Sequence, residues 1–184
     1  MQTARDQRRT FYLEKTRHEL DALVERGVRV SGNAFSSVLF LKGEPNEEER
    51  TSEAILKGAD GTALRAALTA LGYPPEDWCA LLTTSSDDSP LEPSLLREAI
   101  CTLDPSTLVA CDEAAAQSLR EAYSDELTRL ADLDEAMLTA GKLTRLLGMR
   151  ILNLGGFEAA LTDDRQKQLM WARLKQIPPL GAPY

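Results

Sequence analysis

The chain has 184 residues, of which 43% are hydrophobic and 27% charged, and its 21 Lys and Arg against 29 Asp and Glu give a formal net charge of −8. This length and balance predict one globular domain with a substantial core. An acidic protein repels a phosphate backbone, so the composition argues against strong non-specific binding of nucleic acid.

The hydropathy and the cysteines predict a cytoplasmic protein with no membrane partner. The first ten residues, MQTARDQRRT, lack the apolar core of a secretory signal, and no apolar run approaches the length that crosses a bilayer. Cys79, Cys101 and Cys111 are odd in number, widely spaced and set in apolar segments, which favours reduced core thiols.

The first thirty residues, 1–30, are predicted to form an N-terminal helix. From Thr10 to Arg26, apolar residues alternate with charges at a spacing compatible with an amphipathic helix, and Gly27 is a suitable stop. His18 is the single histidine of the sequence, and its place between Arg17 and Glu19 favours a surface residue. The residues 28–33 are interpreted as a turn-rich link.

A strand, an acidic loop and a helix are predicted between residues 38 and 68. The apolar run 38–41 is rich in strand formers, and Gly43, Pro45 and Asn46 stop it sharply. Gly58 and Gly61 then bracket a turn, after which leucines recur at helical spacing. In an open α/β sheet, the loop at the carboxyl end of such a strand is where ligands bind, so we expect the functional site here.

The remaining segments continue this alternation. Apolar runs at 78–83, 107–111 and 150–154 predict three further strands, and the segments between them predict helices, with Asp112 as an N-cap. Leucines in the segment 124–147 recur at helical spacing, as in a core helix or a partner-facing stripe. Residues 178–184 contain prolines and predict an extended tail. We therefore expect a single domain with a three-layer α/β (αβα) sandwich and a mostly parallel four-stranded sheet.

The segments GEPNEEE (43–49) and ILKGADGTAL (55–64) resemble the first motif of the uracil-DNA glycosylase superfamily, in particular its bacterial iron-sulfur branch, with the pattern GEAPGxxE and PFxGxxGxLL. Similarity continues through LGYPP (71–75), STLVACDEAAAQSL (106–119) and the segment 151–177. The resemblance covers about three quarters of the chain and implies a glycosylase-like fold, an origin in DNA repair, and a ligand-binding site at the positions of the motifs: Gly43, Glu44, Pro45, Asn46, Leu56, Gly58, Leu82, Gly155 and Gly156.

The same resemblance implies a degenerate active site. The family's uracil-stacking phenylalanine falls at Leu56, its base-reading asparagine at Leu82 and its histidine at Gly155. Neither leucine can hydrogen-bond a base, and glycine offers only backbone. The carboxylates of Glu44 and Glu49 remain as catalytic candidates. We expect the strand ends to bring Leu56, Leu82 and Gly155 together beside Glu44.

Cofactors and anion binding are also expected to differ from the family. Its iron-sulfur cluster needs four thiolates, and the N-terminal third here contains no cysteine, so we expect no cluster and, with one histidine, no zinc site. The family has a glycine at the Asp112 position, where backbone approaches a phosphate, and an aspartate opposes an anion there.

Three functions stay open on the sequence alone. The first is a glycosylase-like protein that has lost uracil excision and acts as a non-catalytic binding or assembly module, with a protein partner and weak or no DNA binding. The second is a base-excision hydrolase that uses Glu44 or Glu49 to activate water. The third is a small-molecule binding protein that uses the cleft at the strand ends. Fold alone does not choose among them.

Overall fold

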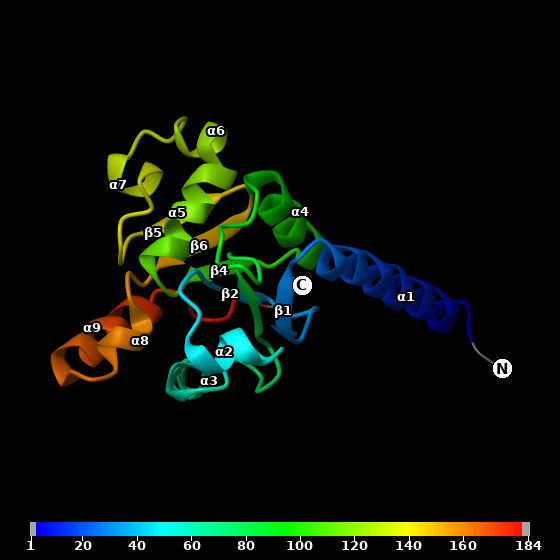
Figure 1. Ribbon diagram of the computed structural model, residues 1–184, viewed down its shortest axis with the longest axis horizontal. Helices are drawn as coiled ribbons and strands as arrows, with labels where there is room; N and C mark the ends of the chain where they lie inside the picture. The colour runs from blue at the N-terminus through cyan, green and yellow to red at the C-terminus, as the bar shows by residue number, and fades with distance from the viewer. Residues whose placement is uncertain (1–2, 182–184) are drawn as a thin grey trace.

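Alternating strands and helices build the body of the protein around one sheet (Figure 1). The computed structural model describes residues 3–181, and within that range it contains six strands and nine helices. The strands are β1 (Arg29–Gly32), β2 (Val38–Lys42), β3 (Cys79–Leu82), β4 (Thr107–Ala110), β5 (Leu143–Leu146) and β6 (Met149–Asn153). The helices are α1 (Ala4–Glu25), α2 (Glu47–Thr51), α3 (Ala59–Leu71), α4 (Pro93–Leu103), α5 (Glu113–Ala122), α6 (Ser124–Leu127), α7 (Leu133–Ala136), α8 (Phe157–Ala160) and α9 (Asp164–Leu174).

The sheet is mixed, with the strand order β1-β3-β2-β4-β6-β5. Its four inner strands are parallel to one another, whereas β1 pairs antiparallel with β3 and β5 pairs antiparallel with β6. The α/β fold is therefore confirmed, and the four predicted strands correspond to the four inner ones. The prediction of a four-stranded sheet is wrong, because an antiparallel strand lies on each edge.

Both missed strands have sequences that do not look like buried strands. The segment 28–33, expected to be a turn-rich link, contains β1, whose residues are only partly buried. The segment 124–147, expected to be helical, contains two short helices and β5. Leu147 and Gly148 join β5 to β6 with φ of 49° and 82°, as the two central residues of a tight hairpin turn require. The leucines of β5 fit a helical spacing in the sequence, but the hairpin turn places them in an edge strand.

The inner strands divide their side chains between two apolar clusters. Leu39, Leu41 and Leu108 face α4 and α5, whereas Phe40 and Val109 face α3, α8 and α9. This alternation is the period of two that a strand imposes, and it buries both faces of the sheet. Helices on the two faces thus make three layers.

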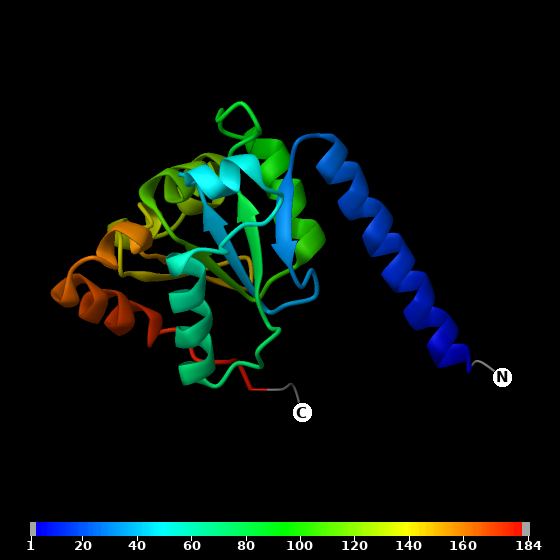
Figure 2. The ribbon, with the colours of Figure 1, turned by 60° about the horizontal axis from the view of Figure 1, so that its bottom comes forward.

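Helix boundaries differ from expectation mainly at the N-terminus. Helix α1 begins at Ala4 rather than at Thr10, because Thr3 and Asp6 form a capping box. It ends before Gly27, as predicted. Figure 2 shows α1 running away from the sheet, so that its first turns lie far from the body. Within residues 3–181, no helix is long and apolar enough to cross a bilayer.

The start of the C-terminal segment is held to the body by hydrogen bonds. The carbonyl of Pro178 accepts a hydrogen bond from Arg150 (2.8 Å), and that of Ile177 accepts one from the Tyr73 hydroxyl (2.8 Å). Of the predicted tail 178–184, residues 182–184 lie outside the described residues.

The connections place a topological switch point between β2 and β4. The chain leaves β2 and returns as β3 on one side, and then crosses to β4 on the other side. In such sheets, the crevice outside the carboxyl ends of the strands at the switch point is where ligands bind. The loops that follow β2 and β4 therefore frame the candidate site.

Candidate functional site

A buried lysine lies at the carboxyl end of β2. The Lys42 side chain is 3% exposed, and its Nζ lies 2.8 Å from Glu49, 2.7 Å from Asp60 and 2.8 Å from Glu158. Glu49 and Asp60 are themselves buried, whereas Glu158 reaches in from the surface. An ammonium group has three hydrogens to donate, so these three carboxylates satisfy it completely. We call these four residues the Lys42 cluster.

The carboxylates keep Lys42 charged. Burial alone would lower the pKa of Lys42, but the hydrogen bonds with Asp60, Glu158 and Glu49 outweigh it, and the pKa lies above its usual value of 10.5. A lysine that acts as a nucleophile or a general base needs a lowered pKa. Lys42 is therefore an ion-pair centre rather than a catalytic amine.

Local structure fixes Glu49 in place. Asn46 caps α2, and its backbone N–H donates to the Glu49 carboxylate (3.0 Å) while its side chain accepts from the Glu49 N–H (3.0 Å). The other Glu49 oxygen accepts from the N–H of Leu56 (2.9 Å). Because both oxygens are engaged, Glu49 closes the loop between β2 and α3 and is not free to activate water.

Asp60 reaches the cluster because α3 begins in close contact with the preceding loop. A Cβ at Gly61 would lie 1.7 Å from the carbonyl oxygen of Leu56, so only glycine fits there. Asp60 lies in the first turn of α3, on the same buried side as Leu64 and Leu68. The helix thus delivers a carboxylate to an otherwise apolar interface.

Asp112 ties the loops after β2 and β4 together. It caps α5 by accepting from the N–H of Ala115 (2.8 Å), as predicted, and it also accepts from the N–H groups of Gly43 and Glu44 (3.0 Å each). Gly43 allows this approach, because a Cβ there would lie 2.6 Å from the Ala115 nitrogen. A carboxylate therefore takes the backbone donors that face the switch point.

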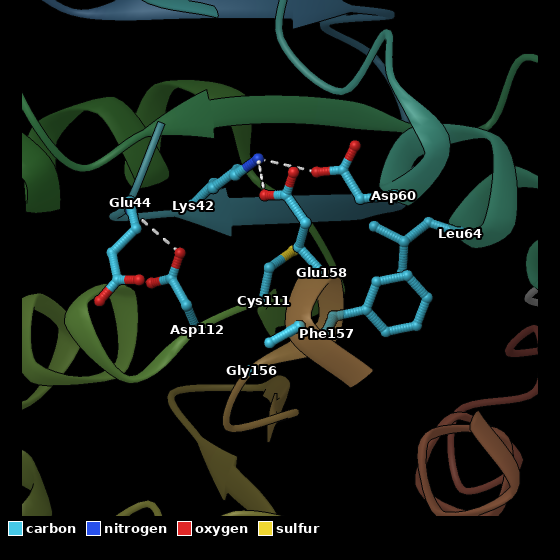
Figure 3. Close-up of a pocket in the computed structure, with 10 residues that line it drawn as sticks. Lys42, Glu44, Asp60, Leu64, Cys111, Asp112, Gly156, Phe157 and Glu158 are labelled. Carbon is cyan, nitrogen blue, oxygen red and sulfur yellow. Dashed lines mark hydrogen bonds and ion pairs between the residues drawn. The ribbon is translucent and has the colours of Figure 1, made fainter. Parts of the chain in front are cut away.

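The cavity at the switch point is small. Its volume is about 70 Å³, whereas sites for small molecules usually enclose about 300–1,000 Å³. Figure 3 shows Lys42, Asp60 and Glu158 along one side of it, with Glu44 and Asp112 on another. It is lined by Lys42, Glu44, Asp60, Leu64, Cys111, Asp112, Gly156, Phe157, Glu158 and Ala159.

No side chain in this cavity is prepared as a thiol nucleophile. Burial, reinforced by the nearby Asp112 carboxylate, raises the pKa of the Cys111 thiol well above its usual value. Cys79 is the buried first residue of β3, and burial raises its pKa to about 12. Because the thiolate is the reactive form, both cysteines are inert core residues.

The structure brings together only part of the predicted site. Glu44 is exposed and lines the switch-point cavity with Gly156. Leu56 and Leu82 are fully buried in one apolar cluster. Gly155 is exposed and lines another cavity, where a Cβ would lie 2.9 Å from Ala140.

The other predicted residues shape the loops. Gly43 and Pro45 are buried, Asn46 caps α2, and Gly58 stands at the N-cap of α3. The expectation that Leu56, Leu82 and Gly155 meet beside Glu44 is wrong, because none of the three lines the cavity that Glu44 lines. The two leucines belong to the buried apolar cluster, and Gly155 lines a different cavity.

Sequence reasoning missed Lys42, Asp60 and Glu158. Two of them carried a local signal, since Lys42 ends a run of four apolar strand residues and Asp60 precedes Leu64 and Leu68 on a helical stripe. A charged side chain on a buried face needs a partner of opposite charge. The pairing of Lys42 with Asp60 could therefore have been predicted from the sequence. Glu158 carried no such signal, because it meets Lys42 only through the tertiary fold.

No protein-family model matches the chain, and no curated protein matches its sequence significantly. Among residues 3–181, no group of three His, Cys, Asp or Glu side chains is arranged to hold a metal ion.

Proposed function

We propose that this chain is a glycosylase-like protein that has lost uracil excision and serves as a non-catalytic binding or assembly module. The observation that carries the proposal is the carboxylate of Asp112, which accepts three backbone N–H groups at the switch point. N–H groups at a helix start bind anions, including phosphates. Asp112 supplies an internal anion and repels an external one.

The base-reading positions support the same function. Leu56 and Leu82 are buried among apolar side chains and carry no hydrogen-bonding group. A nucleobase that entered there would leave its own donors and acceptors unpaired, at a cost of about 1–3 kcal/mol each. The switch-point cavity of about 70 Å³ also lacks the volume for a flipped base.

An excision assay tests the loss of chemistry. Uracil-containing single- and double-stranded oligonucleotides are incubated with excess protein, and abasic sites are measured after alkaline cleavage. We expect no cleavage above a no-enzyme control, with an active uracil-DNA glycosylase as the positive control. Excision that Glu44→Ala abolishes would overturn the proposal.

A binding assay tests the role given to Asp112. Fluorescence anisotropy with single-stranded DNA should give an affinity weaker than about 1 µM that falls with salt. Asp112→Ser keeps an N-cap and frees the Gly43 and Glu44 donors, so we expect it to raise the affinity several-fold. The matched control is Asp163→Ser, because Asp163 caps α9 in the same way and lies away from the cavity. Equal effects of the two variants would show that net charge alone governs binding.

One observation favours the hydrolase alternative. Glu44 lines the switch-point cavity, and among the described residues its carboxylate has no ion pair. It is the residue on which a remaining water-activating function would depend. The Glu44→Ala arm of the excision assay therefore distinguishes the two functions directly.

A further inference from the structure

Helix α1 is built as an independent arm. Its start is fixed by the capping box of Thr3 and Asp6, and its single buried residue is Leu23, near its end. Figures 1 and 2 show the arm projecting from the body in both views. Helix stability in proteins comes largely from packing of one face against a partner, and most of this helix has none among the described residues. A helix of this kind is stabilised when a second surface covers its free face.

One side of the arm packs on the body near the end of the helix, and the opposite side packs on nothing among the described residues. Leu20 and Leu23 pack against the apolar cluster beneath α4. With about 3.6 residues per turn, the side opposite to them is continuous along the whole helix. We call it the outer face, and each of its members is exposed: Ala4, Gln7, Arg8, Phe11, Glu14, Lys15, His18, Asp21, Ala22 and Glu25.

The charges on the outer face complement those of a second outer face that runs in the opposite direction. When two such faces are laid antiparallel about a two-fold axis between Glu14 and Lys15, Arg8 lies opposite Asp21 and Glu14 lies opposite Lys15. Phe11 then lies opposite His18. The remaining positions pair Gln7 with Ala22 and Ala4 with Glu25, so every member of the face meets another member.

We propose that the outer face of α1 binds the outer face of a second copy of this chain, antiparallel, to form a two-fold dimer. The symmetry makes each ion pair occur twice, with no like charges opposite each other among these pairs. It also covers Phe11, which is 63% exposed in the single chain. Covering an exposed aromatic ring removes apolar surface from water.

Charge distribution favours a second copy over nucleic acid. Arg5, Arg8 and Arg9 make the start of the arm basic, whereas Glu19, Asp21 and Glu25 make its end acidic. A polyanion would be attracted by the first half and repelled by the second, and by the net charge of −8. An antiparallel copy places each half against its opposite. This inference does not depend on the chemistry of the strand ends.

Sedimentation equilibrium on the full chain measures the dimer. Because exposed ion pairs are individually weak, we expect a dissociation constant on the order of 10 µM at low salt, rising with added salt. Arg8→Asp places Asp opposite Asp21, and Asp21→Arg places Arg opposite Arg8. Each variant alone should be monomeric at concentrations where the wild type is dimeric.

Mixing the two variants is the decisive measurement. In a mixed dimer of Arg8→Asp with Asp21→Arg, both pairs are again opposite in charge, so the dimer should return. Arg9→Asp carries the same charge change as Arg8→Asp but lies off the outer face. Alone it should dimerise like the wild type. Mixed with Asp21→Arg it keeps only one of the two ion pairs, so its mixed dimer should be weaker than that of Arg8→Asp with Asp21→Arg.

Circular dichroism of each variant checks that the helix is retained, as these exposed substitutions allow. A wild type that stays monomeric at several hundred micromolar would overturn the proposal, and so would a mixture of Arg8→Asp and Asp21→Arg that stays monomeric. The measurement contains no nucleic acid, so its failure is distinguishable from failure of the excision test.

Discussion

Lys42 and Arg8 are both cations, but their surroundings are opposite. Lys42 is 3% exposed and is surrounded by three carboxylates from α2, α3 and α8. Arg8 is exposed on an arm that touches the body only at its inner end. At the strand ends, where related folds bind ligands, the polar groups are already paired within the chain. On α1, the complementary groups lie on the same helix and cannot reach one another. The difference teaches that a charged group can be satisfied within the fold at the strand ends, whereas on the arm it can be satisfied only from outside the helix.

The largest expected effect comes from removing the cation of the Lys42 cluster. Lys42→Met leaves the buried carboxylates of Glu49 and Asp60 without a counter-charge, and we expect the free energy of unfolding to fall by about 3–5 kcal/mol. Urea denaturation at neutral pH measures the change. The control is Lys57→Met on the exposed surface, which should stay within about 0.5 kcal/mol of the wild type. Equal stabilities of the two variants would show that the cluster is not a structural centre.

The stability of the protein at alkaline pH also tests the ion pairs of Lys42. The folded pKa of Lys42 is raised above the usual 10.5, so its stabilising contribution is fully present below that value. The contribution is lost as the pH rises through the folded pKa. Wild-type stability should therefore decline above about pH 10.5 more steeply than that of Lys42→Met. Parallel declines would mean that the lysine is not paired in solution.

The next effect separates the two ends of the arm. Leu23→Ala opens a cavity where α1 meets the body, and we expect it to cost about 2–5 kcal/mol. Phe11→Ala, in the N-terminal half of α1, should change the free energy of unfolding of the monomer by less than about 0.5 kcal/mol. Thermal unfolding at low protein concentration measures both. A large loss of stability in Phe11→Ala would mean that the N-terminal half of α1 packs against the body.

The inner strands and the cluster were predictable to different degrees. Each inner strand contains consecutive apolar residues, because both faces of the sheet are covered. Such a run can be recognised in the sequence without knowledge of its neighbours in space. The edge strand β1 carries the polar, partly buried Arg29 and Ser31, and β5 carries the exposed Arg145, so neither gives that signal. The sequence pattern indicated Lys42 and Asp60 as charged residues on buried faces. The bonds of Asp112 to the loop after β2 were not predictable, because they depend on how the loops meet in space.

A smaller effect tests the contact on which the closed cleft depends. Gly43→Ala places a methyl group 2.6 Å from the Ala115 nitrogen, so the loop must withdraw from α5. Overpacking of this kind costs about 1–3 kcal/mol. Chemical denaturation measures it against Gly181→Ala, where nothing lies within 4 Å of the added group. If Gly43→Ala were as stable as its control, the hydrogen bonds of Asp112 to this loop would not be fixed in solution.

The smallest expected effect lies beside the Lys42 cluster. Thr83 follows β3, its N–H donates to the carbonyl of Lys42 (2.9 Å), and its side chain is 0% exposed. Among residues 3–181, no group bonds its hydroxyl. Burial of an unpaired hydroxyl is unfavourable, and valine has nearly the same shape, so Thr83→Val should raise the free energy of unfolding by about 1 kcal/mol.

Thr107→Val is the matched control for this substitution. Thr107 is equally buried, but its hydroxyl accepts hydrogen bonds from Arg150 (2.8 and 3.1 Å), and its loss should cost about 1–3 kcal/mol. Opposite signs for the two variants in urea denaturation are the expected result. Equal losses would mean that the Thr83 hydroxyl is hydrated in solution. Water would then reach the end of β3, and the cleft would be more open than the pairing of its charged groups implies.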